Sequence, residues 1–395
     1  MHPSEEIYCE KGTRLRGKTI VLGMTGSIAI VECFSLIREL IRLGAKVIPV
    51  MTPEAAKLAA PDAIEFASGM RPIIELTGQT EHIKYLGDER AADLFMIYPA
   101  TANTISKMAN GIDDTSVTSF ATVALGSKIP IIVAPAMHEY MFENPAVSKN
   151  LETLRSWGVH IIGPHLDGVR AKVASRDEMV AWSIRCLSRD DLNGKRILVI
   201  GGRSEEPLDS MRLITNRSTG LMANVLALRA FERGATVELW MGACNVPLPD
   251  HIPVRRFSTV SDLIGMVKDI DHDYVVVPAA LADFAPESKD GKIPSDQQCD
   301  MILNPLPKVL PIICKKCPNV VGFKAESGLN PSELEEKARQ RLEKYGLKAI
   351  VANDVDSVGK KSTAALLITK NSTKNITGSK VDISDSILNL CLEKQ

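Results

Sequence analysis

The sequence predicts an α/β protein with two doubly wound domains, because two stretches each begin a new strand–turn–helix unit. The first stretch is GKTIVLGMTGS (17–27), and the second is GKRILVIGGRS (194–204). Each consists of Gly-Lys, an apolar run and a glycine-containing turn. The length of 395 residues also exceeds one ordinary hydrophobic core and suits two domains of roughly 150 to 200 residues each.

In the first half, β-branched apolar runs alternate with helical patterns. The expected strands are residues 18–24, 45–51, 94–98, 129–133 and, more briefly, 159–162. After the first strand, apolar residues recur at helical spacing until Gly44, and Thr52-Pro53 has the pattern of a helix N-terminus. Continuous apolar strands separated by helices indicate a parallel sheet that is covered on both faces and binds ligands at its carboxyl edge.

The second half repeats this alternation, and we expect a Rossmann-like, doubly wound domain there. Its expected strands are residues 196–200, 236–241, 274–277, 320–324, 349–352 and 366–369, and its expected helices are roughly 219–233, 259–270, 331–345 and 384–393. The polar segment SRDDLNG (188–194) separates the two halves, so we expect domains at 1–190 and 191–395. Neither half contains GxGxxG, the fingerprint of an ordinary dinucleotide site.

Composition excludes several functional classes. The 47 basic and 48 acidic side chains give a formal net charge of −1, which argues against binding nucleic acid or an anionic membrane. No apolar run is long enough to span a bilayer, and the opening residues lack the apolar core of a secretory signal. We therefore expect a cytoplasmic protein. Its eight cysteines are scattered, and the CxxC of Cys314 and Cys317 has no second ligand pair, so free thiols are favoured over a metal site.

Three turns in the first half are rich in small polar residues: TGS (25–27), PATANTISK (99–107) and APAMHEYM (134–141). Backbone amides and hydroxyls at helix N-termini suit a phosphate. Because the first turn contains no Lys or Arg, it favours a single monophosphate. An ordinary structural turn remains the alternative.

These segments, together with EHI (81–83) and GIDD (111–114), resemble the motifs of the homo-oligomeric flavin-containing cysteine decarboxylases. The resemblance extends from Lys18 to about Leu187. It implies a flavodoxin-like flavoprotein domain, FMN bound between subunits, and oxidative decarboxylation of a cysteine derivative. The residues that it implies around FMN are Gly26, Ser27, Thr52, Thr101, Asn103, Thr104 and Lys107.

The same resemblance suggests substrate-binding and proton-transferring residues. His82 matches an active-site His-Ile pair and is a candidate for proton transfer; the alternative is an exposed helix histidine. Met137 and Met141 match a substrate-binding signature, although methionines also fill cores. His138 stands where that signature has asparagine, and we hypothesise that it anchors the substrate carboxylate.

A second departure is the absence of cysteine from GVRAKVASRDEM (168–179), where the family has a cysteine in a flexible clamp. Lys172 lies near that position. Lys172 could protonate the intermediate, another subunit could supply the group, or the reaction could stop at the oxidised product. A solvated lysine without a role is a further alternative.

The second half has polar motifs just after its strands. Asn216 and Thr219 are expected to cap a helix, and AALADF, GKIPS, NPLPK, GFKAE and VANDV follow downstream. From Asp191 to about Val358 these motifs resemble phosphopantothenate–cysteine ligase. The fusion as a whole resembles the bifunctional coenzyme A biosynthesis proteins of bacteria and archaea.

This resemblance implies that CTP and Mg²⁺ activate 4′-phosphopantothenate as an acyl-cytidylate, which cysteine converts to 4′-phosphopantothenoylcysteine. The first domain would then decarboxylate this product to 4′-phosphopantetheine. Asn216 would act on the acyl-cytidylate with Arg212 beside it, and Lys292 would contact the phosphates. Asp283 would lie near the metal or the cytidine. The remaining nucleotide-binding residues implied are Ala279, Pro305, Leu306, Pro307, Lys308, Phe323, Arg341 and Lys344.

Only the first lysine of the family's KIKK segment is present, and Lys324 is added in GFKAE, so the choice of nucleotide stays open. One alternative is an active ligase with an impaired decarboxylase half. Another is a flavin-binding or regulatory module. The resemblance also implies a homo-oligomer, with trimers of the first domain and dimers of the second giving a dodecamer.

Overall fold

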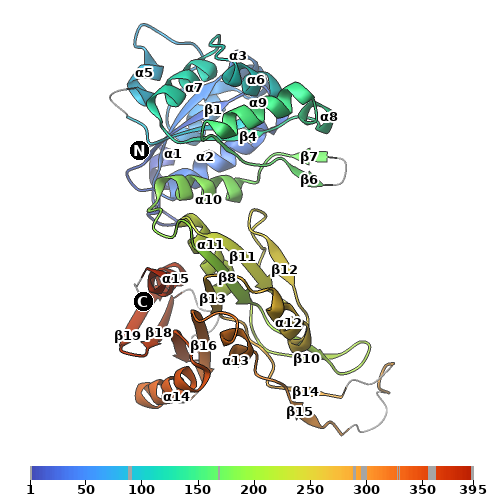
Figure 1. Ribbon diagram of the computed structural model, residues 1–395. Coiled ribbons are helices and arrows are strands. Elements are labelled where there is room, and N and C mark those ends of the chain that lie inside the picture. The colour runs from blue at the N-terminus through green and yellow to red at the C-terminus, as the bar shows by residue number, and fades with distance from the viewer. Residues whose placement is uncertain are drawn as a thin grey trace. The chain divides into compact units, whose positions relative to one another are not determined.

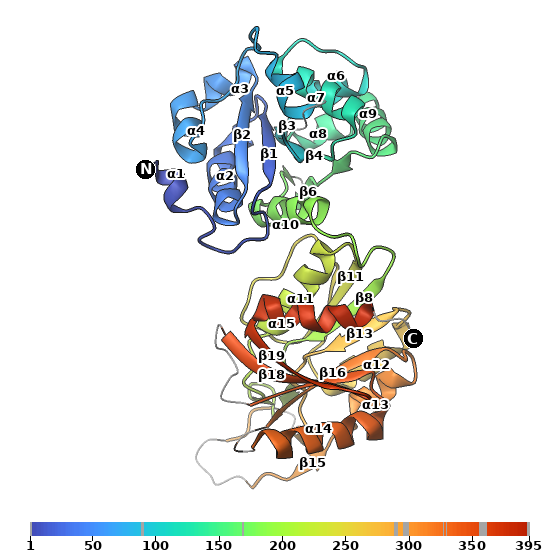
Figure 2. The same ribbon diagram turned by 90° about the vertical axis from the view of Figure 1, so that its left-hand side faces the viewer.

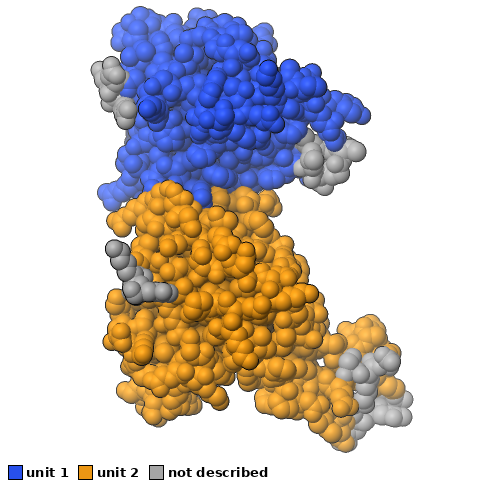
Figure 3. All heavy atoms as spheres, viewed as in Figure 1, with its two compact units in different colours: residues 1–188 blue, residues 189–395 orange. Residues whose placement is uncertain are grey.

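The computed structural model describes residues 2–87, 91–167, 170–287, 291–294, 300–326, 328, 330–354 and 362–392. The chain divides into two compact units, Met1–Ser188 and Arg189–Gln395, which Figure 3 shows in different colours. The division falls within the polar segment SRDDLNG. Each unit has its own sheet and its own hydrophobic core.

The first unit contains a five-stranded parallel sheet in the order β2-β1-β3-β4-β5. Its strands are β1 (Thr19–Met24), β2 (Lys46–Met51), β3 (Leu94–Ala100), β4 (Ile131–Pro135) and β5 (His160–Ile161). This order is that of flavodoxin-like folds, so the fold class expected for the first half is confirmed. Every residue of β3 is buried, as a central strand covered on both faces requires.

Helices cover both faces of this sheet (Figures 1 and 2). Buried residues of α2 and α10 belong to one core cluster, and those of α6, α7 and α9 belong to the other. The helices are α1 (Pro3–Glu6), η1 (Ile28–Glu32), α2 (Cys33–Arg42), α3 (Pro53–Leu58), α4 (Pro61–Ser68), α5 (Glu81–Leu86), α6 (Ala102–Ala109), α7 (Ser116–Ser127), α8 (Glu139–Phe142), α9 (Pro145–Ser156) and α10 (Arg176–Leu187). The helix expected after the first turn therefore begins as a 3₁₀ turn, η1.

A short antiparallel hairpin, β6 (His165–Asp167) and β7 (Arg170–Lys172), was not expected from the sequence. It occupies part of the segment that we compared with the family's clamp. Residues 168 and 169 at its tip lie outside the described residues. The two three-residue strands are too short to give an alternating pattern.

The second unit contains an eight-stranded sheet in the order β12-β11-β8-β13-β16-β17-β18-β19. The strands are β8 (Arg196–Gly201), β11 (Thr236–Met241), β12 (Val254–Arg256), β13 (Tyr274–Val277), β16 (Val320–Glu326), β17 (Ala349–Asp354), β18 (Ser362–Thr369) and β19 (Thr373–Ser379). The first six are parallel, and β18 and β19 form an antiparallel edge. The Rossmann-like α/β class expected for this half is confirmed, with an added edge.

The helices of this unit also lie on both faces of its sheet (Figure 1). The helices α12 (Val260–Met266), α13 (Val309–Cys314) and α14 (Pro331–Tyr345) contribute to one core cluster. The helices α11 (Leu221–Glu232) and α15 (Lys380–Leu388) pack against each other. Short 3₁₀ turns follow two of these helices, namely η2 (Val267–Asp269) and η4 (Asn389–Cys391).

Two antiparallel ribbons extend from the second unit. One joins β9 (Glu205–Pro207) to β10 (Leu213–Thr215), and the other joins β14 (Phe284–Pro286) to β15 (Leu303–Pro305). They carry exposed apolar side chains, including Met211, Leu213 and Phe284. None of the helices described by the structure combines the length and apolar character that crossing a membrane requires.

Candidate functional site

In the first unit, the turns after β1 and β3 are joined at the carboxyl edge of the sheet. The hydroxyl of Thr25 donates to the carbonyl oxygen of Pro99 at 2.8 Å and accepts from the backbone N–H of Thr101 at 3.0 Å. Thr25 is 1% exposed. Because β1 and β3 are neighbours, this buried hydroxyl holds the TGS and PATANTISK turns in a defined relative position.

Three helix N-termini open at this edge, each capped by a residue that we associated with FMN. Ser27 accepts from the N–H of Ala29, Thr52 from that of Ala55, and Thr101 from that of Thr104. The Thr52 cap predicted from the sequence is therefore confirmed. The structure thus brings hydroxyls and partly satisfied N–H groups to the sheet edge at which phosphates bind in doubly wound folds.

Gly26 allows the first turn to approach α3. A Cβ atom at this position would lie 2.8 Å from the Cβ of Glu54, closer than two carbon atoms can pack. Any larger residue would push the TGS turn away from the α3 N-terminus.

Two other residues associated with FMN have different surroundings. The Nζ of Lys107 lies 2.7 Å from a carboxylate oxygen of Asp114, so its charge is already compensated. Asn103 is exposed on α6. An anion at this edge would therefore be held mainly by hydroxyls and backbone N–H groups.

The start of α7 also reaches the edge, which the sequence did not suggest. Ser116 donates its hydroxyl hydrogen to the carbonyl oxygen of Met51 at 2.9 Å. Thr115 and Thr118 form a reciprocal capping box. The motif DTSVT contains this N-cap pattern and could have revealed it.

His82 lies on α5 with its ring against Phe120, at a centroid distance of 6.4 Å. Its Nδ1 is buried and has no hydrogen-bond partner among the described residues. The alternative of an exposed helix histidine is therefore wrong. A buried ring nitrogen without a partner is costly, and a bound ligand that hydrogen-bonds to it would remove that cost.

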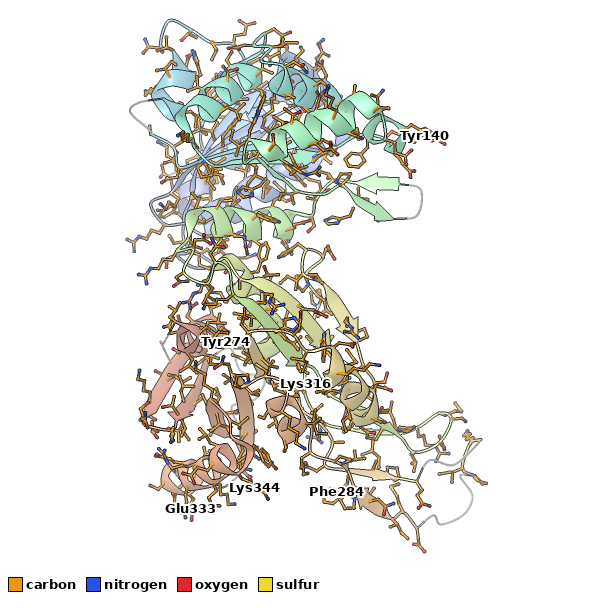
Figure 4. The ribbon with its side chains drawn as sticks, viewed as in Figure 1. Tyr140, Tyr274, Phe284, Lys316, Glu333 and Lys344 are labelled. Carbon is orange, nitrogen blue, oxygen red and sulfur yellow. The ribbon has the colours of Figure 1, made fainter. Side chains whose placement is uncertain are left out.

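His138 caps α8: its Nδ1 accepts from the N–H of Tyr140 at 3.4 Å. This role places the ring hydrogen of a neutral His138 on Nε2. Met141 and Tyr140 beside it are exposed, and Figure 4 labels Tyr140. Met137, by contrast, packs partly against the core.

Lys172 is exposed on β7, directly opposite His165 of β6. The Nε2 of His165 lies 2.5 Å from a carboxylate oxygen of Glu178, whose side chain is 4% exposed. The sequence did not single out this His–Glu pair. It connects the hairpin to α10.

In the second unit, a cavity of about 670 Å³ opens at the carboxyl edge of the sheet. Residues 216–223 line it together with segments that follow β13 and precede α13. Side chains from β16, α14, β17, β18 and α15 complete the lining. The cavity lies where the sequence predicted a substrate crevice.

Seven residues that we associated with the ligase line this single cavity although they come from separate segments. They are Asn216, Ala279, Asp283, Pro307, Lys308, Phe323 and Arg341. Asp283 and Lys308 form an ion pair. Arg341 lies over the ring of Tyr345, 5.8 Å from its centroid.

The sequence predicted that Asn216 caps α11, but it does not. It donates its side-chain N–H to the carbonyl oxygen of Ala280 at 3.0 Å. The N-cap is Gly220, with φ 78°, and it has no side-chain cap. The hydroxyl of Thr219 accepts from the N–H of Leu221, and its carbonyl oxygen accepts from the N–H of Asn245. A Cβ on Gly220 would lie 2.8 Å from that of Cys244, so this close approach requires glycine.

Ser204, which the sequence did not single out, fixes the loop 279–283. It is completely buried. Its hydroxyl accepts from the N–H of Ala282 at 2.9 Å, and its own N–H donates to the carbonyl of Ala280 at 3.3 Å. This serine therefore holds the loop that carries Asp283 against the turn after β8.

The other residues associated with the ligase do not line the cavity. They are Arg212, Lys292, Pro305, Leu306 and Lys344. Lys344 is exposed on α14 (Figure 4), one helical turn beyond Arg341 and outside the lining of the cavity. Lys324 does line the cavity, but it pairs with Glu326 at 2.5 Å and lowers the pKa of that carboxyl by hydrogen bonding.

Asp209 positions the segment that contains Lys292. Its carboxylate accepts from the N–H of Ile293 at 3.0 Å and from those of Met211 and Arg212 at 2.8 and 2.7 Å. These bonds, that from Ile293 first, lower the pKa of Asp209. Arg212 in turn donates to the carbonyl of Ile293, so it holds the backbone beside Lys292 and does not accompany Asn216.

Metal ligands are sparse in the described part of the chain, which contains no group of three His, Cys, Asp or Glu side chains suited to a metal. Asp283 offers one exposed carboxylate at the cavity. Mg²⁺ often binds through one or two carboxylates together with substrate phosphates, so this residue fits such an ion. Cys317 is buried, with its thiol 3.6 Å from the carbonyl of Asp273.

Comparisons with known proteins cover both units. A family model described as "Flavoprotein" matches residues 9–188, and one described as "DNA/pantothenate metabolism flavoprotein C-terminal domain" matches residues 192–394. A protein of Thermococcus kodakarensis named "Coenzyme A biosynthesis bifunctional protein CoaBC" is 42% identical over 383 residues, covering 95% of both chains. The protein of the same name from Methanocaldococcus jannaschii is 35% identical over 98% of this chain and 96% of its own.

Solved structures match single units. The DNA/pantothenate metabolism flavoprotein from Streptococcus pneumoniae is 22% identical and has a TM-score of 0.46. The match covers 50% of this chain and 97% of that one.

Proposed function

This chain belongs to the family of bifunctional coenzyme A biosynthesis proteins, and we propose from this premise which step each unit performs. The chain is an enzyme with a decarboxylase and a ligase activity, and its first unit is a flavoprotein. We assign the decarboxylase to residues 1–190 and the ligase to residues 191–395. The observation that carries this assignment is the cavity of the second unit, which gathers ligase-associated residues from separate segments.

For the ligase we propose CTP, Mg²⁺, 4′-phosphopantothenate and cysteine as reactants. The carboxylate attacks the α-phosphate of CTP, an acyl-cytidylate forms and pyrophosphate leaves. The amine of cysteine then attacks the acyl carbon, forms the amide and releases CMP. Catalysis requires neutralised phosphate charge and a dry, ordered site.

The cavity residues suit these needs. One side-chain hydrogen of Asn216 is used by Ala280, which leaves the other for the acyl-cytidylate. Arg341 offers positive charge to phosphates, and Phe323 offers a surface to the base. Asp283 offers oxygen to Mg²⁺, and an ion bound there would release Lys308 from its ion pair with Asp283 to contact the phosphates. Lys292 lies outside the lining, so we propose that it reaches the phosphates by movement of its segment or from a second copy.

For the decarboxylase we propose that the flavin is FMN. When bound, FMN would oxidise the cysteine moiety of the substrate. The oxidised group can then accept the electron pair that remains when CO₂ leaves. Hydroxyls of Ser27, Thr52 and Thr101, with their helix N-termini, would hold its phosphate. The Nδ1 of His82, which has no hydrogen-bond partner in the described part of the chain, suits proton transfer. The Nε2–H of His138 suits the substrate carboxylate.

The clamp cysteine has no counterpart here, and we propose that Lys172 donates the proton that completes the product. Lys172 is exposed on the hairpin, where it is accessible to a substrate.

We further propose a homo-oligomer, with trimers of the first unit and dimers of the second giving a dodecamer. Exposed apolar side chains on the two ribbons, including Met211, Leu213 and Phe284, support contact between copies. Light scattering after size-exclusion chromatography measures the mass of the assembly. A measured mass equal to that of a single chain would contradict this proposal.

Product analysis tests the two activities together. The purified chain is incubated with phosphopantothenate, cysteine, CTP and Mg²⁺, and products are identified by mass spectrometry. We expect phosphopantetheine, CO₂, CMP and pyrophosphate. Accumulation of phosphopantothenoylcysteine would show an impaired decarboxylase, and absence of any amide product would overturn the ligase assignment. Replacement of CTP by ATP in parallel tests the nucleotide.

A further inference from the structure

Lys380 lines the cavity of the second unit, although no motif singled it out. It is the first residue of α15, and a capping box of Ser379 and Asp382 fixes that helix start. The hydroxyl of Ser379 accepts from the N–H of Asp382 at 3.3 Å, and the carboxylate of Asp382 accepts from the N–H of Ser379 at 2.8 Å. The backbone of Lys380 is therefore held rigidly at the cavity wall.

Two pairs of side chains establish how α15 lies beside α11. Arg229 of α11 binds Asp385 of α15 at 2.9 Å, and Arg233 binds Asn389 at 2.8 Å. Since four residues separate the partners on both sides, the two helices run in the same direction. Lys380 precedes Asp385 by five residues, so it lies beside the first turn of α11, which also lines the cavity.

The first turn of α11 is suited to an anion. Its N-cap is glycine without a capping side chain. Within the described chain, the N–H groups of Met222 and Ala223 have no hydrogen-bond acceptor. Such free N–H groups and the helix dipole favour negative charge.

Among the described residues, the ammonium group of Lys380 also has no acidic partner. The other lysines of the cavity have acidic partners: Lys308 pairs with Asp283, and Lys324 pairs with Glu326. Burial lowers the pKa of the Lys380 ammonium group, and an anionic ligand would relieve that unfavourable desolvation.

We propose that Lys380 is a specificity-determining residue that binds the phosphate monoester of the acyl substrate beside the first turn of α11. It thereby selects 4′-phosphopantothenate over pantothenate, which lacks this phosphate. The proposal rests on the ligase function proposed above. In this proposal the phosphate monoester binds at Lys380, and the nucleotide binds at the part of the cavity lined by Asp283 and Lys308.

The test compares Lys380→Ala, Lys380→Arg and the full-length wild type with two acyl substrates, 4′-phosphopantothenate and pantothenate, at saturating CTP. Lys374→Ala is the matched control, because Lys374 is exposed on β19 and does not line the cavity. Ligation is followed by pyrophosphate release, and thermal melting verifies that each variant is folded.

We expect Lys380→Ala to lower kcat/KM for phosphopantothenate by about 10- to 100-fold, the range of a charged hydrogen bond. The loss should appear mainly in KM. The value for pantothenate and the KM for CTP should be unchanged, and Lys380→Arg should recover most of the loss. Inorganic phosphate should inhibit the wild type competitively against phosphopantothenate, and inhibit Lys380→Ala less.

Equal losses with both acyl substrates, or a raised KM for CTP, would overturn the assignment of the monoester to Lys380. Unchanged kinetics in a folded Lys380→Ala variant would overturn it as well. A different result distinguishes failure of the ligase function itself: the wild type would then release no pyrophosphate with either acyl substrate.

Discussion

Replacement of Ser204 by alanine should impair the ligase without affecting the decarboxylase. The hydroxyl of Ser204 is fully buried and accepts from the N–H of Ala282 at 2.9 Å. Alanine would leave that N–H without an acceptor, at a cost of about 1 to 3 kcal/mol. Because this bond fixes the loop that carries Asp283, part of the cost should appear as misplacement of the loop.

If the whole cost falls on the active conformation, ligase kcat/KM should decrease by roughly 5- to 150-fold. The assay is pyrophosphate release with phosphopantothenate and CTP. Decarboxylation of added phosphopantothenoylcysteine, measured on the same sample, should be unchanged because we assign that chemistry to the first unit. Ser386→Ala is the control, since Ser386 is half-buried and its hydroxyl donates to the carbonyl oxygen of Asp382 within α15.

The reasoning would be refuted by a folded Ser204→Ala variant that has normal ligase kcat/KM. A loss shared equally by both activities would also refute it, because it would indicate a general folding defect.

Three further predictions concern stability, pH and substrate binding. Asp385→Ala should lower the free energy of unfolding of the second unit by about 1 to 3 kcal/mol. The reason is that it removes a partly exposed carboxylate that Arg229 and Arg233 share. Urea denaturation measures this free energy, and an unchanged midpoint would contradict the prediction. Folding lowers the pKa of Asp209, so the ionised carboxylate stabilises the folded state. This stabilisation is complete above the pKa of the unfolded chain, about 4, and is lost as pH falls through the lower pKa of the folded state. Denaturation at several pH values should therefore show Asp209→Asn less stable than wild type near neutrality and the difference shrinking in acid; a difference independent of pH would exclude this linkage. Finally, His138→Ala should lower decarboxylase kcat/KM about 10- to 100-fold, whereas His138→Asn should retain most of it because an amide still donates to a carboxylate; equal activity of the two variants would show that His138 is not the anchor.

Local signals in the sequence predicted several elements accurately. The helix expected at 331–345 is α14 at those bounds, since Asn330 caps its start and Gly346 ends it with φ 66°. Thr52 and Pro53 start α3 as expected. Such caps act within one turn of the chain and can be recognised without knowledge of the fold.

Elements that depend on distant partners were missed. The strand β19, TKNITGS, is largely polar and forms because it pairs with β18 at the sheet edge. The β6–β7 hairpin and the β9–β10 and β14–β15 ribbons consist of three-residue strands. The rest of the unit determines which of these strands pair. An alternating or apolar pattern does not reveal them.

The candidate sites divide in the same way. The sequence by itself determined the α/β class, the start of two doubly wound halves and, through motif resemblance, the residue types of two chemistries. Only the tertiary structure decided which of those residues meet. It gathers Asn216, Asp283 and Arg341 in one cavity, leaves Lys292 and Lys344 outside it, and adds Lys380 from the last helix. The physical reason is that caps and hydrophobic periods are local, whereas a cavity is formed by segments far apart in the chain.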